Sequence, residues 1–238
     1  MAHTILSPDK RTRACRTPEA SLRAEALERD LQEALCTMNG RALSSMAPSP
    51  CAVSTMTISG KLNVADVCPT QLLVAVDWMD SSTPLSTARC TRKPQFNNQV
   101  SVRYGTKSIK MFRNGSVHVT GCKTPGEFVQ AVTAVCVAMT EAGIGDIVVE
   151  SFSVLMINIT FCANTTLRLQ ALRDKSLERG WQGSYDADIY PGLNLKIPVG
   201  ARTVTALVFR SGNVILTGSK SPAEAVEAHD KLMDLLES

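Results

Sequence analysis

One segment of the chain occurs twice, 97 residues apart. "KSIKMFRNGSVHVTGCKTPGEFVQAV" covers residues 107–132 and "VTALVFRSGNVILTGSKSPAEAVEAH" covers 204–229, and 11 of the 26 aligned positions are identical. Unrelated segments do not share so many positions, so the chain contains a duplication. A duplicated unit of this length predicts two halves with the same supersecondary architecture.

Each copy carries the same local signals in the same order. A strand-like stretch turns at Gly115 or Gly212, and glycine readily adopts the positive φ that a tight hairpin needs. The residues TPGE at 124–127 and SPAE at 221–224 then form a capping box, with Ser or Thr as N-cap and Glu three residues later. Apolar residues at helical spacing follow, so each copy predicts a hairpin and then a helix.

The segments upstream of the two copies complete the repeat. β-rich runs lie at 52–62 and 148–161, helical stretches near 63–78 and 166–180, and further strands at "NQVSVRY" and "LNLKI". The predicted order is β-α-β-β-β-β-α, twice. This order indicates an α+β fold, a curved antiparallel sheet with helices on one face. We expect a first repeat at 51–143 and a second at 144–238.

Residues 1–50 differ from the rest and form an N-terminal arm. A polar, basic start is followed by Thr17-Pro18, which begins a helix that ends near Gly40. Its apolar stripe consists of Ala20, Ala24, Leu27, Leu31 and Leu35. This stripe either packs on the protein's own domain or binds a partner.

The second copy has apolar side chains on both faces of its strands. Because helices cover one face, the other should be polar, yet it carries Thr205, Leu207, Phe209, Ile215 and Thr217. An uncovered apolar face indicates a binding surface. The equivalent face of the first copy is more polar and carries Ser108, Lys110, Phe112, His118 and Thr120.

Charge is separated along the chain, although the net charge is only +3. Residues 81–126 contain eight Lys or Arg and no acid, and residues 189–223 contain four and no acid. The acidic residues concentrate in the predicted helices. Basic strands with an apolar open face suit a nucleic acid, whereas the plainer interpretation is solvated edge charges over an ordinary core.

Several classes of function are disfavoured by the sequence. The eight cysteines are scattered without a C-x2-C pair, so we expect reduced thiols and no metal site. Three histidines and no phosphate-binding loop give no catalytic constellation, so an enzyme is the least favoured class and no cofactor is expected. No signal peptide or membrane span is present, which predicts a soluble intracellular protein.

The second half carries a family resemblance. "SYDADIYPGLNLKI" followed by "TALVFRSGNVILTGSK" resembles the core domain of the TATA-binding protein family, over roughly residues 51–238. The segment "FNNQVSVRYGTKSIKMFRNGSVHVTG" is more similar to the diverged TATA-binding-like proteins of large DNA viruses. The resemblance implies a saddle of two pseudo-symmetric repeats, whose concave ten-stranded sheet sits on the DNA minor groove.

The resemblance also implies roles for individual residues. The side chains that would wedge between base steps are Phe96 and Phe112 in the first half and Tyr190 and Phe209 in the second. Contacts to the groove floor would come from Val53, His118 and Thr120, and from Leu207, Ile215 and Thr217. Phosphate contacts would come from Arg103, Lys123, Lys196 and Lys220.

Some positions depart from the family pattern. The family's base-contacting Asn falls on Cys51 in the first half, and in the second on Phe152 or, in another register, on Asn158. Lys110 stands where the family has Leu, and His118 where it has Val. Bending of A·T-rich or deformable DNA is therefore better supported than recognition of a strict TATA element.

Partner contacts follow from the same resemblance. Tyr185, Asp188 and Ile189 match the family's contact with the B-type initiation factor. The sequence thus predicts a general transcription initiation factor that binds and bends double-stranded promoter DNA and recruits a B-type factor and RNA polymerase. The expected location is the nucleus, or for a virus the viral factory or virion, and otherwise the cytoplasm. The alternative is a TATA-binding-like paralogue that acts mainly as a protein-interaction module. A homodimer of the free protein through the apolar face is also expected.

Overall fold

The structure is a computed structural model that describes residues 17–41, 48–64, 85–87 and 99–238. The helix expected near 63–78 lies outside these residues except for its first two positions, and Phe96 lies outside them as well. None of the helices in the described part of the chain is long and apolar enough to cross a membrane.

The described elements follow the order that the duplication predicts. The helices are α2 (Pro18–Asn39), α4 (Pro125–Glu141), α5 (Leu169–Glu178) and α6 (Pro222–Glu237). The earlier strands are β1 (Ala52–Leu62), β2 (Leu85–Thr87), β3 (Gln99–Tyr104), β4 (Lys107–Phe112) and β5 (Ser116–Cys122). The later strands are β6 (Val149–Cys162), β7 (Gln182–Asp186), β8 (Tyr190–Val199), β9 (Arg202–Phe209) and β10 (Asn213–Ser219). The second repeat therefore has the predicted order β-α-β-β-β-β-α in full.

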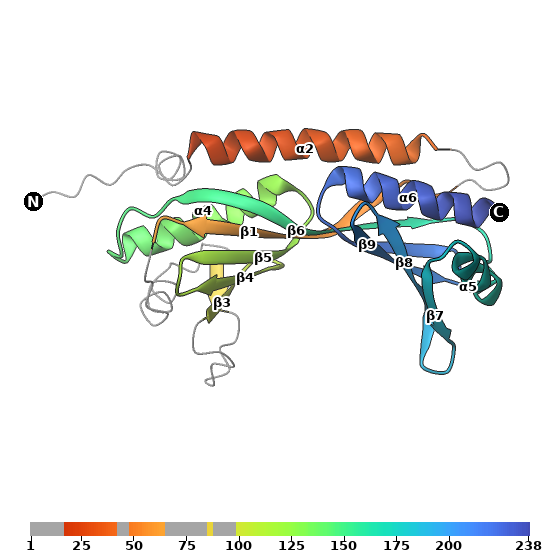
Figure 1. Ribbon diagram of the computed structural model, residues 1–238. Helices are drawn as coiled ribbons and strands as arrows, with labels where there is room; N and C mark the ends of the chain where they lie inside the picture. Colours follow the sequence, from red (N-terminus) through yellow and green to blue (C-terminus); the bar gives the residue numbers. More distant parts are fainter. Residues whose placement is uncertain (1–16, 42–47, 65–84, 88–98) are drawn as a thin grey trace, which may run out of the picture. The chain divides into compact units, whose positions relative to one another are not determined.

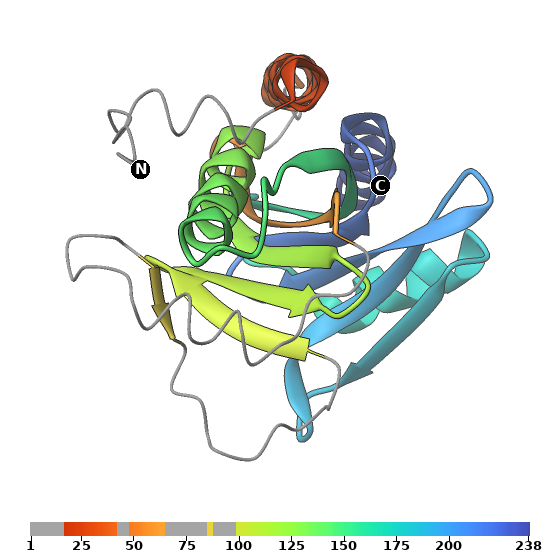
Figure 2. The ribbon, with the colours of Figure 1, turned by 90° about the vertical axis from the view of Figure 1, so that its left-hand side faces the viewer.

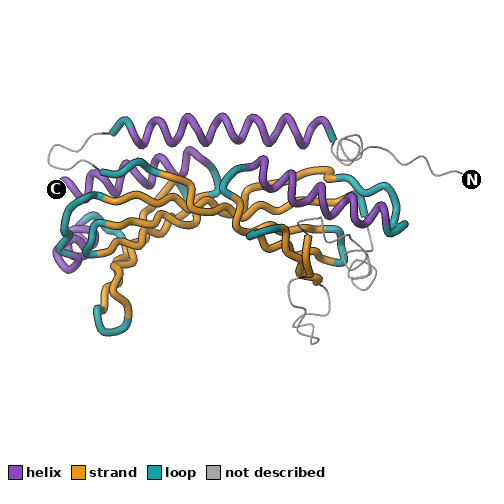
Figure 3. The backbone as a smooth tube through the Cα atoms, turned by 180° about the vertical axis from the view of Figure 1, so that it is seen from behind, coloured by secondary structure: helices purple, strands orange, loops and turns teal. Residues whose placement is uncertain are grey.

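The strands form one sheet in the order β2-β3-β4-β5-β1-β6-β10-β9-β8-β7. The chain divides into two compact units, unit 1 with Met1–Glu28 and Thr57–Ser153, and unit 2 with Arg29–Met56 and Val154–Ser238. In unit 1, α4 lies along one side of the strands (Figures 1 and 2). In unit 2, α6 packs on β8, β9 and β10 (Figures 1 and 3).

The two hairpin turns are built alike. The N–H of Gly115 donates to the carbonyl of Phe112 at 2.9 Å, and the N–H of Gly212 donates to that of Phe209 at 2.9 Å. Both glycines have positive φ, +80° and +87°. The carbonyl oxygen of each also accepts a hydrogen bond at 2.9 Å from the end of the first strand of its repeat, from the N–H of Leu62 in β1 and from that of Ala163 directly after β6. The predicted glycine turns are thus confirmed, and their carbonyls tie each hairpin to the neighbouring strand.

Both predicted capping boxes are present. Ser221 Oγ accepts from the N–H of Glu224 at 3.2 Å, and the Glu224 carboxylate accepts from the N–H of Lys220 at 2.8 Å. The first copy makes the same two bonds 97 residues earlier, at 3.3 and 2.6 Å. These bonds satisfy N–H groups that have no partner inside the helix, so α4 and α6 begin where the sequence predicts.

The core of unit 2 confirms the predicted alternation of its strand residues. One face of β9 and β10 is fully buried and consists of Val204, Ala206, Val208, Val214 and Leu216. It packs on buried side chains of α6 that include Ala228, Leu232 and Met233. The opposite face stays partly exposed, and we call this side of each unit's strands its open face.

Helix α2 packs on its own chain. Ala20, Ala24 and Leu31 of its predicted stripe are buried, Leu27 and Leu35 are half-buried, and Ala34 and Met38 are buried too. Before its first turn, Thr17 Oγ1 donates to the carbonyl of Val149 at 3.0 Å within unit 1. In its last turn, Asn39 Oδ1 accepts from the N–H of Cys51 at 2.6 Å within unit 2. Of the two interpretations of the stripe, these contacts support packing on the protein's own domain.

A buried histidine in α6 predicts that acid destabilises the protein. His229 is 1% exposed, with its ring 5.2 Å from that of Phe161 and its Nδ1 3.4 Å from Asp230 Oδ1. Burial and the charge of Arg41 lower the pKa of His229, and together they outweigh the Asp230 carboxylate, which raises it. Below a pH of about 6.5 the imidazole of His229 therefore binds a proton in the unfolded chain, whereas in the folded chain it stays neutral to a lower pH.

Stability should accordingly be complete above pH 6.5 and decline as the pH falls below it. We expect thermal melts to show a lower melting temperature at pH 5.5 than at pH 7.5, and His229→Gln to reduce that difference. Part of the difference in melting temperature between the two pH values should remain in the variant. The reason is that burial and the charge of Lys110 also lower the pKa of His118, which contributes in the same direction. An equal pH dependence in the variant and the parent would contradict this assignment.

Candidate functional site

The open face of unit 2 combines apolar and hydroxyl side chains. Leu207 and Ile215 lie opposite each other on β9 and β10, and Thr205 and Thr217 form the next cross-strand pair. All four are partly exposed, whereas Val204, Ala206, Val208, Val214 and Leu216, which alternate with them, are buried on the side of α6. The predicted groove residues Leu207, Ile215 and Thr217 therefore lie together on one surface.

Two aromatic rings stand side by side on this face. The ring centroids of Tyr190 and Phe209 are 6.0 Å apart and the ring planes meet at 62°, an edge-to-face arrangement. Gly192 pairs with Phe209 across the strands. A Cβ at position 192 would lie 2.7 Å from Tyr190 Cε1 and 3.0 Å from Phe209 Cε1. The glycine in "YPGLNLKI" thus leaves room for both predicted wedge residues.

An amide and a hydroxyl on this face are joined by a short hydrogen bond. Thr217 Oγ1 donates to Asn158 Oδ1 at 2.6 Å. The competing candidate, Phe152, is 4% exposed and packs on Phe128 with 5.3 Å between ring centroids. Of the two alternatives that the sequence left open, Asn158 lies on the open face and Phe152 lies in the core against α4.

Cys51 does not lie where the sequence places it. It precedes β1, is 7% exposed, and burial raises the pKa of its thiol to about 11. Its N–H donates to Asn39 Oδ1 at the end of α2, so its backbone is joined to that helix. Cys51 is therefore a core residue, and its expected place on the open face is corrected.

The open face of unit 1 is more polar, as expected. Lys110 and His118 are cross-strand partners on β4 and β5, and the His118 ring lies 4.9 Å from that of Phe112. Burial and the charge of Lys110 lower the pKa of His118, which favours the neutral imidazole. Thr120 is exposed on the same strand. Val53, assigned with these residues, is half-buried on the part of β1 that belongs to unit 2.

The predicted basic residues have different surroundings. Arg103 on β3, Lys123 after β5 and Lys220 after β10 are exposed. Lys196 on β8 is half-buried, and its Nζ donates to Thr205 Oγ1 at 2.7 Å. Three of the four ammonium or guanidinium groups therefore reach solvent, while Lys196 is held on the open face by a threonine.

The turn between β7 and β8 presents an apolar side chain to solvent. Ile189 is 82% exposed, Asp188 is exposed and Tyr185 is half-exposed. Asp186 shapes the turn, because its side chain accepts from the N–H of Asp188 at 3.1 Å and its carbonyl from that of Ile189 at 3.2 Å. Asp186 is not among the site residues predicted from the sequence, although Asp is a recognised turn residue.

Comparison with known proteins identifies similar chains. Residues 153–238 match the family model described as "Transcription factor TFIID (or TATA-binding protein, TBP)". The TATA-box-binding protein of Methanocaldococcus jannaschii is 27% identical over 129 residues, which cover 54% of this chain and 67% of that protein. TATA box-binding protein-like 2 of Mus musculus is 29% identical over 139 residues, which cover 58% of this chain and 38% of that protein.

A solved structure shares the fold. It is described as "Methanococcus jannaschii TBP", superposes with a TM-score of 0.61 at 20% identity, and covers 79% of this chain and 98% of its own. The predicted α+β fold of the TATA-binding type is confirmed, and residues 153–238 are similar to this family. The relatives named here are archaeal and mammalian, so the resemblance to viral proteins stays a prediction.

Proposed function

We propose that this protein is a transcription initiation factor that binds promoter DNA with the open faces of its units and bends the duplex through the minor groove. The observation that carries the proposal is the edge-to-face pair of Tyr190 and Phe209, beside an apolar floor whose other side is covered by α6. In bound DNA the two rings would enter a base step and partly unstack it. No catalytic step and no cofactor are required.

The chemistry of the unit 2 face suits a minor groove rich in A·T pairs. That groove presents only acceptor atoms at A·T pairs, and guanine adds an amino group that an apolar floor cannot bind. Leu207 and Ile215 would lie against the groove, and the Asn158 amide NH₂ remains able to donate to a base because its oxygen is engaged by Thr217. Arg103, Lys123 and Lys220 would contact phosphates.

Recruitment of further factors belongs to the same proposal. The exposed Ile189 at the β7–β8 turn, with Asp188 beside it, would contact a B-type initiation factor, which in turn brings RNA polymerase. The proposal places the protein in the nucleus, or in the viral compartment where transcription occurs if its source is a virus. In the absence of DNA, the open apolar faces would favour a homodimer.

The alternative is a protein-interaction module with weak or no DNA binding. Lys110 and His118 on the open face of unit 1 favour it, because both are polar where a groove floor is apolar. The observed burial of Cys51 removes one argument for this alternative. An interaction module would keep the Ile189 contact and lose the wedge function.

Bending of a duplex labelled at both ends tests the proposal. The full chain is titrated into an A·T-rich duplex and a G·C-only duplex of equal length, and energy transfer between the end labels is recorded. We expect transfer to rise with the A·T-rich duplex, and the affinity to fall steeply as salt increases, because bound phosphates release counterions. Equal, weak and unbent binding of both duplexes would favour the interaction module.

A further inference from the structure

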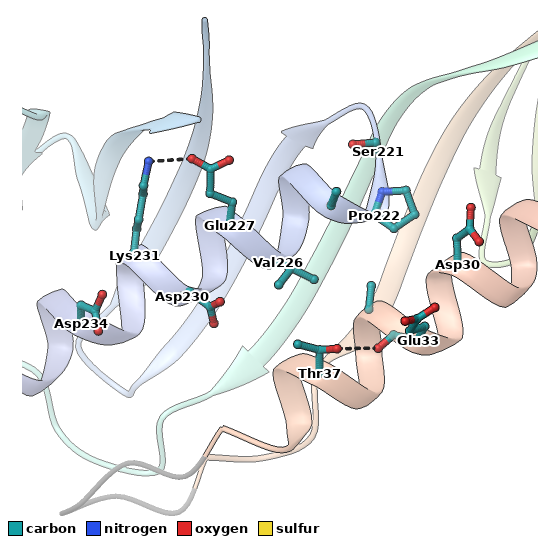
Figure 4. A pocket seen from close by; sticks show the side chains of 12 residues that line it. Asp30, Glu33, Thr37, Ser221, Pro222, Val226, Glu227, Asp230, Lys231 and Asp234 are labelled. Carbon is teal, nitrogen blue, oxygen red and sulfur yellow. Dashed lines mark hydrogen bonds and ion pairs between the residues drawn. The ribbon is translucent and has the colours of Figure 1, made fainter. Parts of the chain in front are cut away.

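A groove runs between two helices of unit 2 on the side away from the open face. Its volume is about 770 Å³, and its two walls are residues 30–37 of α2 and residues 222–234 of α6 (Figure 4). The side chains of Ala34, Pro222 and Val226 supply its apolar lining. Neither wall contributes to the DNA contacts proposed above, so that function does not account for the groove.

Carboxylates surround this apolar lining. Asp30 and Glu33 stand on the α2 wall, and Glu227, Asp230 and Asp234 on the α6 wall (Figure 4). Lys231 is the one basic residue among those lining the groove, and it is paired with Glu227 at 2.7 Å. The rim is therefore strongly anionic.

Arg41 of the same chain shows that carboxylates of this groove bind a guanidinium group. Arg41 follows α2 and its guanidinium forms ion pairs with Asp230, at 3.0 Å, and with Asp234. Two cations of the chain, Arg41 and Lys231, thus neutralise most of the charge of the three carboxylates on the α6 wall. On the α2 wall, no ion pair joins Asp30 or Glu33 to another described residue, and both side chains are exposed.

The charge decides the class of ligand. The five carboxylates outnumber the two cations paired with them, Arg41 and Lys231. The remaining negative charge repels nucleic acids and anionic membrane surfaces and attracts a segment rich in Lys and Arg. An apolar residue of the same segment can bury itself against Ala34 and Val226. Charge complementarity and an apolar anchor site together describe a docking groove for a basic peptide segment.

We propose that the groove between α2 and α6 docks a lysine- and arginine-rich segment of a partner protein, with one apolar side chain against Ala34 and Val226 and cations on Asp30 and Glu33. The α6 wall extends over 222–234, about 18 Å at 1.5 Å per residue, which is matched by about twelve helical residues. Partner binding at this groove and DNA binding at the open face use different surfaces of unit 2.

A fluorescent twelve-residue peptide of Lys and Leu in amphipathic order is the probe, titrated into the full-length protein and followed by anisotropy. We expect saturable one-to-one binding that weakens with salt. The double variant Asp30→Lys/Glu33→Lys should weaken it about tenfold or more, because two favourable charge pairs become repulsive. Val226→Gln should weaken it about threefold or more by making the anchor site polar.

The matched control is Glu19→Lys/Glu150→Lys, which changes net charge equally at exposed carboxylates outside the groove. Glu19 lies 11 residues before Asp30 on α2, about 16 Å at 1.5 Å per residue, and Glu150 follows Val149, whose carbonyl accepts a hydrogen bond from Thr17. It should change probe affinity less than about twofold at 0.15 M salt, since exposed charges beyond a Debye length are screened. Equal weakening by both double variants, or no effect of Val226→Gln, would overturn the proposal by showing diffuse attraction only. Self-association that the groove variant abolishes would also overturn it and assign the groove to a second copy.

Discussion

Gly212→Ala is expected to lower the free energy of unfolding by about 2 to 4 kcal/mol. The residue has φ of +87°, a region that L side chains rarely adopt, and an added Cβ would lie 2.6 Å from the carbonyl oxygen of Thr165. That oxygen belongs to backbone, so the overlap cannot be relieved by turning a side chain. The hydrogen bond from Ala163 N–H to Gly212 would be strained at the same time. Urea denaturation measures the change.

Gly200→Ala is the matched control for this variant. Gly200 also has positive φ, +53°, but nothing lies within 4 Å of an added Cβ. Gly200→Ala should therefore lower the free energy of unfolding only by the strain of an L residue at positive φ, about 1 to 2 kcal/mol. Equal losses at positions 200 and 212 would mean that the contact with the Thr165 carbonyl contributes nothing, contrary to the structure.

Phe209→Ala is expected to reduce affinity for an A·T-rich duplex by about a hundredfold, or about 2.7 kcal/mol. The substitution removes one of the two rings that would enter the base step and leaves Tyr190 without its edge-to-face neighbour. Phe209 is half-exposed at the end of β9, so the loss of packing in the core is small. A gel-shift titration gives the affinity, and a thermal melt confirms that the variant is folded.

Two further variants make this result specific. Phe209→Leu keeps an apolar wedge and should retain part of the affinity, whereas Ile189→Ala removes an 82% exposed apolar side chain outside the open face and should leave DNA binding unchanged. If Phe209→Ala bound DNA as tightly as the parent, the open face of unit 2 would not be the DNA surface. Loss of binding in Ile189→Ala alone would point to the β7–β8 turn instead.

Features that depend on a few neighbouring residues could be predicted from the sequence. The capping box at Ser221 and the turn at Gly212 each close within four residues, so the residue types alone determine their hydrogen bonds. The alternation of β9 and β10 follows from the two-residue period of a strand, and it correctly placed Leu207 and Ile215 on the open face. The family resemblance rests on the same segment.

The sequence could not place Phe152, Asn158 and Cys51 correctly, because regular strand alternation does not hold near these residues. Phe152 and Ile157 of β6 are both buried although their positions differ by five, an odd number that would put them on opposite faces of a regular strand. For this reason the sequence could not choose between Phe152 and Asn158. Cys51 was misplaced because it lies before β1, where strand alternation does not apply, and beside the end of α2, whose Asn39 accepts from its N–H.

The sequence by itself determined the duplication, the turns, the helix starts and the apolar open face, since each is set by local hydrogen bonds or by strand periodicity. Only the tertiary structure decided that Asn158 meets Thr217 and that residues 30–37 and 222–234 enclose an acidic groove. Those contacts join segments far apart in the chain. Their geometry follows from how helices pack on a sheet, which no local pattern of residues encodes.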